Sequence, residues 1–342
     1  MPEAALPARE DRGGPAQPLL IIRDLVKRFP VKAPPFAPKR ALLAVDHVSF
    51  DILKGETLGI VGESGCGKST TSRLIMTLLE PTAGELIFDG EEVGGPNLPI
   101  REFRRQTQMV FQDSYASLNP RLAIEETIAF APRVHGMPRR RALERARELL
   151  DAVGLAPARF ARRFPHQLSG GQRQRVNIAR ALALDPRLVI LDEPVSALDK
   201  SVQAQVLNLL NDLKARFGLT YLFISHDLDV VQYISDRVVV MYLGQIVEQG
   251  PVAAIYEDAR HPYTAALLAS RPALGTPRER APLSGEPPDP MNPPSGCRFR
   301  PRCALAEPVC ARVAPAPVPV AAGHEVACLM EMPGSGHGRA RA

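Results

Sequence analysis

The stretch Gly62–Ser69 reads GESGCGKS and decides how the rest of the chain is arranged. It satisfies the pattern of glycine, four residues, glycine, lysine and serine or threonine, which is typical of a loop that binds nucleotide phosphates. The apolar run from Leu58 to Val61 predicts a buried strand before the loop, and residues 70–79 predict a helix after it. A turn from strand to helix is the context that this motif requires, and it argues against a chance match.

The residue types of this loop suit ATP bound with Mg²⁺. Glycines let the backbone N–H groups at a helix N-terminus approach phosphate oxygens. Lys68 can reach the β- and γ-phosphates, and the Ser69 hydroxyl can bind magnesium. The residues expected to contact the nucleotide or its metal in this segment are Gly62, Glu63, Ser64, Gly65, Cys66, Gly67, Lys68, Ser69 and Thr70.

Length and charge exclude several classes of protein. A chain of 342 residues can bury a large core, and we expect one main domain with an appendage. The net charge is +5, with arginines concentrated at 101–105, at 139–147 and at the extreme C-terminus, so no continuous basic face for nucleic acid is expected. No uncharged run reaches the roughly 18 residues that span a bilayer, and the N-terminal segment has no apolar signal-peptide core. We expect a soluble cytoplasmic protein.

The first ninety residues predict a small β-rich layer around the phosphate loop. Strands are expected at 19–26, 45–52 and 86–88, and the proline-bearing segment 30–40 is expected to be a loop or insertion. Phe29 lies just before that segment. An aromatic residue there can stack on adenine, and the alternative is a core phenylalanine at the end of a strand.

The middle of the chain predicts helices and a second anion-binding site. Residues 109–112 predict a short strand that ends at Gln112, and residues 138–154 predict an amphipathic helix that Gly154 terminates. The sequence LSGGQ at 168–172 opens another long helix, and a serine with two glycines at a helix N-terminus can bind an anion. One phosphate group does not need two such sites in one chain, so the second site must serve something else.

Acidic and histidine side chains follow two predicted buried strands. The run Leu188–Leu191 predicts a central parallel strand, with Asp192 and Glu193 at its carboxyl end, where such sheets bind ligands. Asp192 can hold magnesium and Glu193 can polarise an attacking water, the alternative being two exposed turn acids. The strand 221–224 brings His226 to the same edge. A lone histidine is more often structural, but this position favours contact with the γ-phosphate.

Six motifs, in this order, resemble those of the ATP-binding subunits of ABC transporters, over about residues 19–330. They are the Walker A loop 62–69, the Q-loop residue Gln112, the signature 168–172, the Walker B strand 188–193, the D-loop 196–199 and the switch histidine His226. The resemblance implies an α/β fold, a RecA-like P-loop NTPase core with an antiparallel β subdomain, a helical signature subdomain and a small cysteine-bearing C-terminal extension.

The resemblance also implies how the second anion site is used. In this family two subunits face head to tail, and each signature contacts the γ-phosphate bound by the partner's Walker A loop. The residues that would act in this way are Ser169, Gly170, Gly171 and Gln172. Lys68, Glu193, Gln112 and His226 are then the expected catalytic residues, Ser69, Gln112 and Asp192 would serve Mg²⁺, and Phe29 would stack on adenine.

Finer similarity is to the ATPases of dipeptide and oligopeptide permeases. It rests on the insertion after Phe29, on the runs 165–184 and 192–210, and on HPYTAALLAS at 261–270. The sequences DEPVSALD and GESGCGKS are closer to the second of two paralogous ATPases, so the resemblance implies a heterodimer. Its partners would be two transmembrane permease subunits and, indirectly, an extracytoplasmic peptide-binding protein. Lys200 departs from the family, which has an apolar residue after SALD, and is expected to alter the dimer surface.

The C-terminal segment contains four cysteines, Cys297, Cys303, Cys310 and Cys328, separated by five, six and seventeen residues. In a reducing compartment such a set favours metal over disulfides, although close C-x-x-C pairs are absent. The family carries a similar CxFxxRC segment, and the resemblance implies a [4Fe-4S] cluster. Zinc and uncoordinated thiols are the alternatives, because ligand type alone does not select the metal.

These predictions combine into an importer ATPase attached to the cytoplasmic face of the membrane. The expected division is a disordered segment 1–18, an ATPase domain 19–250 with a helical subdomain at about 114–170, a C-terminal extension 251–332 and a disordered tail 333–342. The region 114–154 would hold the groove for the permease's coupling helix. The rivals are transport of another solute such as nickel, a non-transport ABC ATPase, and a scaffold that only retains the fold.

Overall fold

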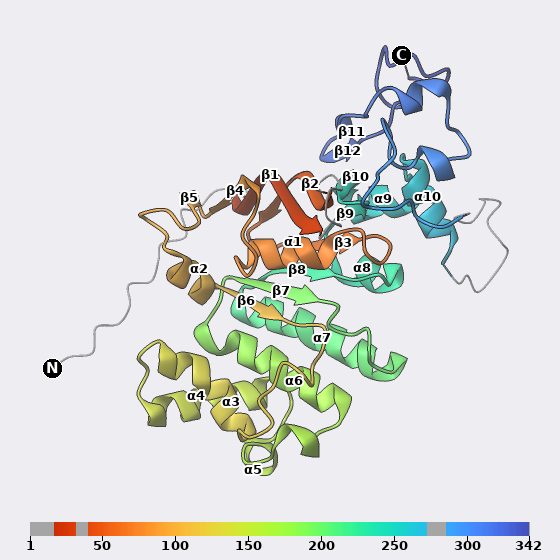
Figure 1. Cartoon of the computed structure of the whole chain (residues 1–342). Helices are drawn as coiled ribbons and strands as arrows, with labels where there is room; N and C mark the ends of the chain where they lie inside the picture. The colour runs from red at the N-terminus through yellow and green to blue at the C-terminus, as the bar shows by residue number, and fades with distance from the viewer. Residues whose placement is uncertain (1–16, 32–39, 272–284, 342) are drawn as a thin grey trace.

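The computed structural model describes residues 17–31, 40–271 and 285–341. Figure 1 shows a central sheet, a layer of helices below it and a C-terminal extension above it. Several predictions fall wholly or partly outside the described residues: the disordered start at 1–16, most of the proline-bearing loop at 32–39, part of the proline-rich segment at 272–284 and the last residue, 342.

The larger sheet has the strand order β11-β12-β10-β9-β3-β8-β7-β6. Its parallel part consists of β3 (Thr57–Val61), β6 (Thr107–Val110), β7 (Leu188–Asp192), β8 (Thr220–Ile224) and β9 (Arg237–Tyr242). Every residue of β3, β7 and β8 is buried, as expected for apolar strands in a sheet that is covered on both faces. Because these strands run parallel, their carboxyl ends and the loops that follow them lie at one edge of the sheet.

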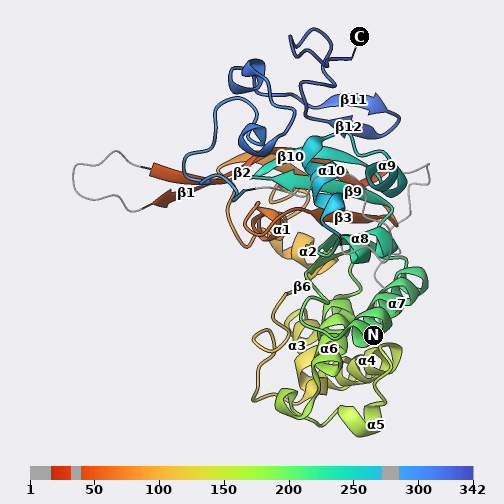
Figure 2. The ribbon, with the colours of Figure 1, turned by 90° about the vertical axis from the view of Figure 1, so that its right-hand side faces the viewer.

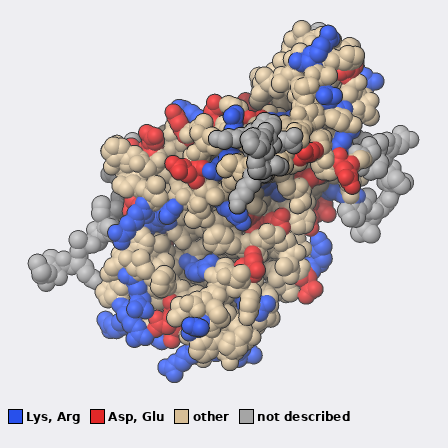
Figure 3. All heavy atoms as spheres, in the orientation of Figure 1, with Lys and Arg blue, Asp and Glu red and all other residues tan. Residues whose placement is uncertain are grey.

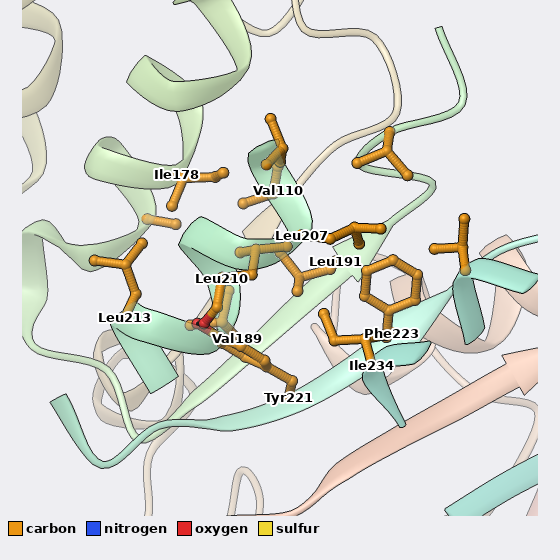
Figure 4. Packing of buried hydrophobic residues seen from close by; sticks show 14 of the residues in the cluster. Val110, Ile178, Val189, Leu191, Leu207, Leu210, Leu213, Tyr221, Phe223 and Ile234 are labelled. Atoms are coloured by element: carbon orange, nitrogen blue, oxygen red, sulfur yellow. The ribbon is translucent and has the colours of Figure 1, made fainter. Parts of the chain in front are cut away.

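Alternate residues of the parallel strands pack into two different cores, because successive side chains of a strand point to opposite faces. Ile190 and Leu222 join a core with α1 (Lys68–Ile75) and the smaller sheet. Val189 and Tyr221 join the other core, with α6 (Gly170–Ala181), α7 (Lys200–Phe217) and α8 (Leu228–Ile234). Figure 4 shows this second core, in which the Tyr221 hydroxyl donates to the carbonyl oxygen of Leu210 at 3.0 Å.

The smaller sheet is antiparallel, with the order β2-β1-β4-β5. It contains β1 (Pro18–Val31), β2 (Arg40–Leu53), β4 (Ala83–Phe88) and β5 (Glu91–Glu92), so the predicted β-rich layer is present. Both long strands exceed the prediction, and β1 runs through Phe29 to Val31 because it stays paired with β2 along its length. A turn at Asp89 and Gly90 follows β4, with positive φ at both residues, 52° and 84°.

Helices form a separate layer beside the sheet (Figures 1 and 2). They are α3 (Ile124–Val134), α4 (Arg139–Ala152), α5 (Pro157–Phe160) and α6, whereas α2 (Ile100–Gln106) packs against the smaller sheet through Phe103. Gly154 follows the end of α4 with φ of 72°, which confirms it as the residue that stops this helix. Of the helices described, none is both long and apolar enough to cross a membrane.

Charged side chains of both signs intersperse on the face drawn in Figure 3, with basic groups gathered at its lower left. Arginines of α4 have acidic partners on α3. Arg139 lies 2.5 Å from a carboxylate oxygen of Glu126, and Arg147 lies 2.8 Å from one of Glu125. This pairing uses part of the basic cluster at 139–147 to hold two helices together.

The C-terminal extension continues the main sheet. Strand β10 (Gln245–Pro251) pairs with β9 on one side and with β12 (His324–Val326) on the other, and β11 (Val318–Ala321) follows. Between these strands lie α9 (Val252–Glu257) and α10 (Pro262–Ala269). The fully buried Glu248 of β10 accepts hydrogen bonds from the backbone N–H groups of Arg260 and His261 at 2.7 and 3.0 Å, and it lies 2.9 Å from Nε2 of His324. The extension is therefore built onto the ATPase domain.

Residues 333–341 contact the rest of the extension through His337 and Gly338, and the disorder predicted from 333 onward stays a prediction. His337 is buried, with Nε2 3.1 Å from the carbonyl oxygen of Leu305. The backbone N–H of Gly338 donates to Glu307 at 2.8 Å. The glycine-rich composition of residues 333–341 predicts disorder, whereas His337 and Gly338 contact Leu305 and Glu307 of the extension.

Replacing Leu210 in the second core tests the packing of α7 on the sheet. The side chain is 1% exposed, so Leu210→Ala removes buried methyl groups and leaves a cavity. We expect the free energy of unfolding to fall by about 2–5 kcal/mol. Leu78→Ala is the control, because that side chain is 47% exposed. Equal midpoints of urea unfolding for the two variants would contradict this packing.

Candidate nucleotide-binding and catalytic site

The phosphate loop leaves β3 and enters α1 in a conformation that needs glycine. Gly62 has φ of 151° and Gly67 has φ of 110°. A Cβ on Gly62 would lie 2.2 Å from the carbonyl oxygen of Met241, and one on Gly67 would lie 2.5 Å from that of Ala44. Gly67 is also the N-cap of α1 and has no side chain to cap the first turn, so the helix N-terminus can offer its N–H groups to an anion.

Lys68 is 5% exposed and belongs to the first turn of α1. Its Nζ donates to the carbonyl oxygens of Gly62 at 2.7 Å and Glu63 at 2.9 Å. These carbonyls satisfy the donors of the ammonium group but do not neutralise its charge. The loop therefore holds a shielded positive charge beside the free N–H groups, which is the arrangement that favours a phosphate.

Ser69 and Asp192 meet although they are far apart in sequence. The Ser69 hydroxyl donates to Oδ1 of Asp192 at 3.1 Å. Burial raises the pKa of Asp192, and the neighbouring Glu193 carboxylate adds to this increase, whereas the Ser69 hydrogen bond opposes it. A hydroxyl and a carboxylate are the oxygen donors that Mg²⁺ prefers, so these two residues fit the expected metal, and Gln112 remains a predicted third contact.

Glu193 contacts two of the other three predicted catalytic residues. Its Oε2 accepts a hydrogen bond from Nε2 of Gln112 at 2.9 Å, and its Oε1 lies 3.1 Å from Nδ1 of His226. Gln112 lies just beyond β6, Glu193 follows β7 and His226 follows β8, so three adjacent strands deliver the three side chains. The structure thus brings Gln112, Glu193 and His226 together at one edge of the sheet.

The backbone of Glu193 has φ of 49°, in the left-handed region that residues with a side chain seldom occupy. Its N–H donates to the carbonyl oxygen of Ile224 at 2.9 Å, and its own carbonyl accepts from the Ser196 hydroxyl at 3.1 Å. These bonds hold the unusual conformation in place. Such conformations concentrate at functional sites, because the surrounding structure must stabilise them.

Lys200 links the D-loop region to the histidine loop. Its Nζ lies 2.9 Å from a carboxylate oxygen of Asp227, the residue after His226. Asp227 also caps α8 by accepting from the N–H groups of Asp229 and Val230 at 3.0 and 3.3 Å. The Lys200 side chain is 83% exposed, and its effect on a dimer surface stays a prediction.

The signature sequence forms the N-terminus of α6, as predicted. The Ser169 hydroxyl accepts from the N–H of Gln172 at 3.3 Å, and the Gln172 side chain accepts from the N–H of Ser169 at 3.0 Å, which is a capping box. A Cβ on Gly171 would lie 2.5 Å from a methyl carbon of Val202. Figures 1 and 2 show α6 in the helical layer, apart from α1. Action on a partner's nucleotide stays a prediction for Ser169 and its neighbours, Gly170 included.

The remaining predicted contacts lie at the surface or near it. Ser64 and Gly65 are exposed at the tip of the loop, and Thr70 is half-buried in the first turn of α1. Phe29 is half-buried in β1, where the Nζ of Lys27 lies 5.2 Å from the centre of its ring. Stacking of Phe29 on adenine stays a prediction.

Two side chains of the C-terminal extension reach the phosphate loop, and the sequence analysis did not find them. Arg302 forms a two-pronged ion pair with the carboxylate of Glu63, at 2.7 and 3.0 Å. The Tyr263 hydroxyl accepts a hydrogen bond from the N–H of Glu63 at 2.9 Å. In the sequence these two residues belong to the motifs HPYT and CRFRPRC. Neither motif indicates that its partner is the phosphate loop, which lies about two hundred positions away.

The four C-terminal cysteines line one pocket. All are free thiols, and burial raises the pKa of Cys297, Cys303 and Cys328, in the last case to about 12. The nearby thiols add to the increase for each of the three. In the part of the chain that the structure describes, no group of three or more His, Cys, Asp or Glu side chains is arranged to hold a metal ion.

The fold and the site define a P-loop ATPase. A glycine-rich loop with a buried lysine, a serine–aspartate pair suited to magnesium and a glutamate held by Gln112 and His226 provide the groups for phosphate binding and attack by water. The helical layer with the LSGGQ turn is an addition to the core that P-loop proteins share.

Comparison with known proteins agrees with this class. The family model "ABC transporter" matches residues 45–196, and the model "Oligopeptide/dipeptide transporter, C-terminal region" matches residues 247–310. The chain is 50% identical to the oligopeptide transport ATP-binding protein AppF of Bacillus subtilis (strain 168), over 91% of this chain and 96% of that protein. It is 51% identical to the dipeptide transport ATP-binding protein DppF of Escherichia coli (strain K12), over 84% and 87%.

Solved structures give the same result. The dimeric ATP-binding cassette MJ0796, in a post-hydrolysis state with ADP and Pi, superposes with a TM-score of 0.59 at 30% identity, covering 68% of this chain and 98% of that one. CbiO1 of Clostridium perfringens, described as part of the ABC transporter complex cbiONQ, superposes with a TM-score of 0.61 at 26% identity, covering 70% and 91%. The chain belongs to the ABC transporter family, as an ATP-binding subunit that hydrolyses ATP.

Glu193→Gln tests the role of the glutamate as the group that orients water. Glutamine keeps the shape but removes the charge, so we expect ATP affinity to persist while turnover falls by about a hundredfold or more. Turnover is measured by phosphate release and affinity by equilibrium binding. Lys68→Ala serves as the contrasting variant and should weaken binding itself. Near wild-type turnover in Glu193→Gln would exclude this role.

Proposed function

We propose that this chain drives the uptake of dipeptides or oligopeptides through a membrane permease. The observation that carries the ATPase part is the convergence of Gln112, Glu193 and His226 at the sheet edge that also holds Asp192 and Ser69. The peptide part follows from the matched C-terminal region and from the names of the relatives AppF and DppF. Uptake of another solute, such as nickel, is the second candidate.

The residues of the site suit hydrolysis by electrostatic positioning. Lys68 and the loop N–H groups bind the phosphates, while Ser69 and Asp192 hold Mg²⁺, which when bound offsets the negative charge of the phosphates. Glu193 accepts hydrogen bonds from the attacking water and orients it. Gln112 and His226 then report whether a γ-phosphate is present, because both contact Glu193 directly.

The active assembly is a head-to-tail dimer with a paralogous ATPase. The signature turn supports this arrangement, because Ser169 is exposed at the N-terminus of a helix in the layer apart from α1. Dimers are described for the similar cassette MJ0796. In such a dimer the helix N-terminus behind Ser169 faces the nucleotide held by the partner.

The permease docks on a hollow of the helical layer, of about 410 Å³, beside α3. Leu122, Glu126, Phe130, Arg133 and Val134 line it. Phe130 and Val134 are 58% and 56% exposed, which is unusual for large apolar side chains. An apolar floor with one acidic and one basic rim residue suits a short amphipathic helix of a membrane protein. The chain therefore works at the cytoplasmic face of the membrane, and the extracytoplasmic peptide-binding protein acts only through the permease.

The four cysteines hold a [4Fe-4S] cluster. Convergence of all four thiols on one pocket supports this proposal, because a bound cation stabilises thiolates. In such a cluster each thiolate binds a different iron, whereas zinc gathers four thiolates around one ion.

Reassembly tests the transport function. We expect the chain alone to hydrolyse ATP slowly, and activity to rise at least tenfold when the paralogous ATPase and the permease are added in liposomes, with uptake of labelled dipeptides. Ser169→Arg should block hydrolysis at the partner's site while this chain still binds ATP at its own loop. Full activity of a verified monomer would contradict the dimer, and uptake of Ni²⁺ in place of peptides would select the second candidate.

Iron and sulfide analysis tests the cluster. Anaerobically purified protein should be brown, contain about four iron and four sulfide per chain, and lose both in Cys303→Ser. Cys66→Ser is the matched control, because this cysteine lies in the phosphate loop and should leave iron content unchanged. Colourless protein with one zinc per chain would reject iron, and four freely alkylated thiols without metal would reject the site.

A further inference from the structure

We propose that Arg302, carried by the C-terminal extension, is a positioning residue for the phosphate loop and sets its affinity for ATP. The proposal rests on ATP binding at this loop and is independent of the transported solute and of the metal in the cysteine pocket. It assigns a function in the nucleotide site to a segment that lies more than two hundred positions from the loop in sequence.

The contact between Arg302 and Glu63 is built as a strong one. Both terminal nitrogens of the guanidinium donate to the two carboxylate oxygens, at 2.7 and 3.0 Å. The Arg302 side chain is 5% exposed and that of Glu63 is 23% exposed, so solvent screens the pair only weakly. A two-pronged, shielded pair fixes orientation as well as distance, unlike an exposed surface ion pair.

The backbone of Glu63 is held from the same direction. The hydroxyl of the fully buried Tyr263 accepts from its N–H at 2.9 Å. Tyr263 packs against Tyr242 and Phe299, with ring centres 4.6 and 5.4 Å apart, and the Arg302 guanidinium lies 5.9 Å from the centre of the Tyr242 ring. The extension therefore holds both the side chain and the main chain of one loop residue.

A third contact supports the far side of the loop. Arg298 donates to the carbonyl oxygen of Leu243 and to the carboxylate of Asp46. The next residue of that turn, Gly244, donates its N–H to the carbonyl oxygen of Cys66 at 2.8 Å. Residues 286–290 of the extension also line a hollow of about 450 Å³ together with residues 63–66. The loop is thus enclosed by the extension on more than one side.

The consequence for ATP is electrostatic and geometric. Glu63 is the second residue of a loop that must accept phosphates, and an unpaired carboxylate there repels them and competes for the Lys68 ammonium. Arg302 neutralises that charge and keeps the carboxylate turned away, while Tyr263 fixes the peptide between Gly62 and Glu63. Arg302 lies between Cys297 and Cys303. Any change that unfolds the cysteine-bearing segment 297–328 therefore also releases the phosphate loop.

Equilibrium binding of a fluorescent ATP analogue with Mg²⁺ to the full chain tests the proposal. Arg302→Gln should weaken binding by about tenfold, with kcat at saturating ATP nearly unchanged, so that the change appears in KM. Arg302→Lys should recover part of the affinity, because the charge returns without the fork. Arg300→Gln is the control, since Arg300 belongs to the same short turn but donates to Ser295, and it should bind like the wild type.

The pair is tested by combining variants. Glu63→Gln removes the charge that Arg302 offsets, so Arg302→Gln in that background should cost less than twofold. An equal loss of affinity in both backgrounds would contradict action through Glu63, and wild-type affinity in Arg302→Gln would reject the proposal. If the wild type itself failed to bind Mg-ATP, the proposed function would fail instead. Thermal unfolding of each variant distinguishes a loss of ATP affinity from a loss of folding. Glu63→Gln lies in the phosphate loop and leaves the interior of the cysteine-bearing segment unchanged.

Discussion

A buried ammonium group, that of Lys68, is the constraint on which the site depends. The charge is 5% exposed, and its two short hydrogen bonds go to uncharged carbonyl oxygens. Burial of a charge without a counter-charge is costly, and a phosphate is the ligand that removes this cost. The tight glycine turn and the uncapped start of α1 are needed to bring backbone N–H groups to the same place. The loop is therefore a preformed site for an anion, stabilised by the packing around it.

The sheet topology then determines which side chains can meet the phosphate. Strands β6, β7 and β8 are neighbours and parallel, so Gln112, Glu193 and His226 emerge together although they span more than a hundred residues. A change in strand order would separate them. The left-handed backbone at Glu193, held by the carbonyl of Ile224, turns the carboxylate toward both partners. The chemistry of the site is in this sense a consequence of strand order.

Local patterns predicted the strands and the helices of the ATPase core, because each depends on short-range periodicity or on a motif with a known context. Placing the motifs at strand ends put Asp192, Glu193 and His226 at one edge of the sheet, and the structure adds the contacts of Ser69 with Asp192 and of Gln112 and His226 with Glu193. The contacts of Arg302, Tyr263 and Arg298 could not be predicted in this way. They depend on how a proline-rich segment folds back over the sheet, and no local pattern encodes that path. The contact of His337 with the carbonyl oxygen of Leu305 could not be predicted for the same reason, because the two residues are 32 positions apart.

The C-terminal extension is better understood as part of the catalytic domain than as an appendage. Glu248 is fully buried in β10. It accepts hydrogen bonds from the backbone N–H groups of Arg260 and His261, just before α10, and it lies beside His324 of β12. These contacts fasten the extension to the main sheet, and because they are buried, water cannot substitute for them. His261 beside it is fully buried as a neutral ring, because burial lowers its pKa to about 4. The same short stretch continues into Tyr263, which binds the phosphate loop. One set of buried polar contacts therefore joins the sheet, the extension and the nucleotide site. Because water cannot replace these contacts, we expect a change at any of the three places to affect the other two.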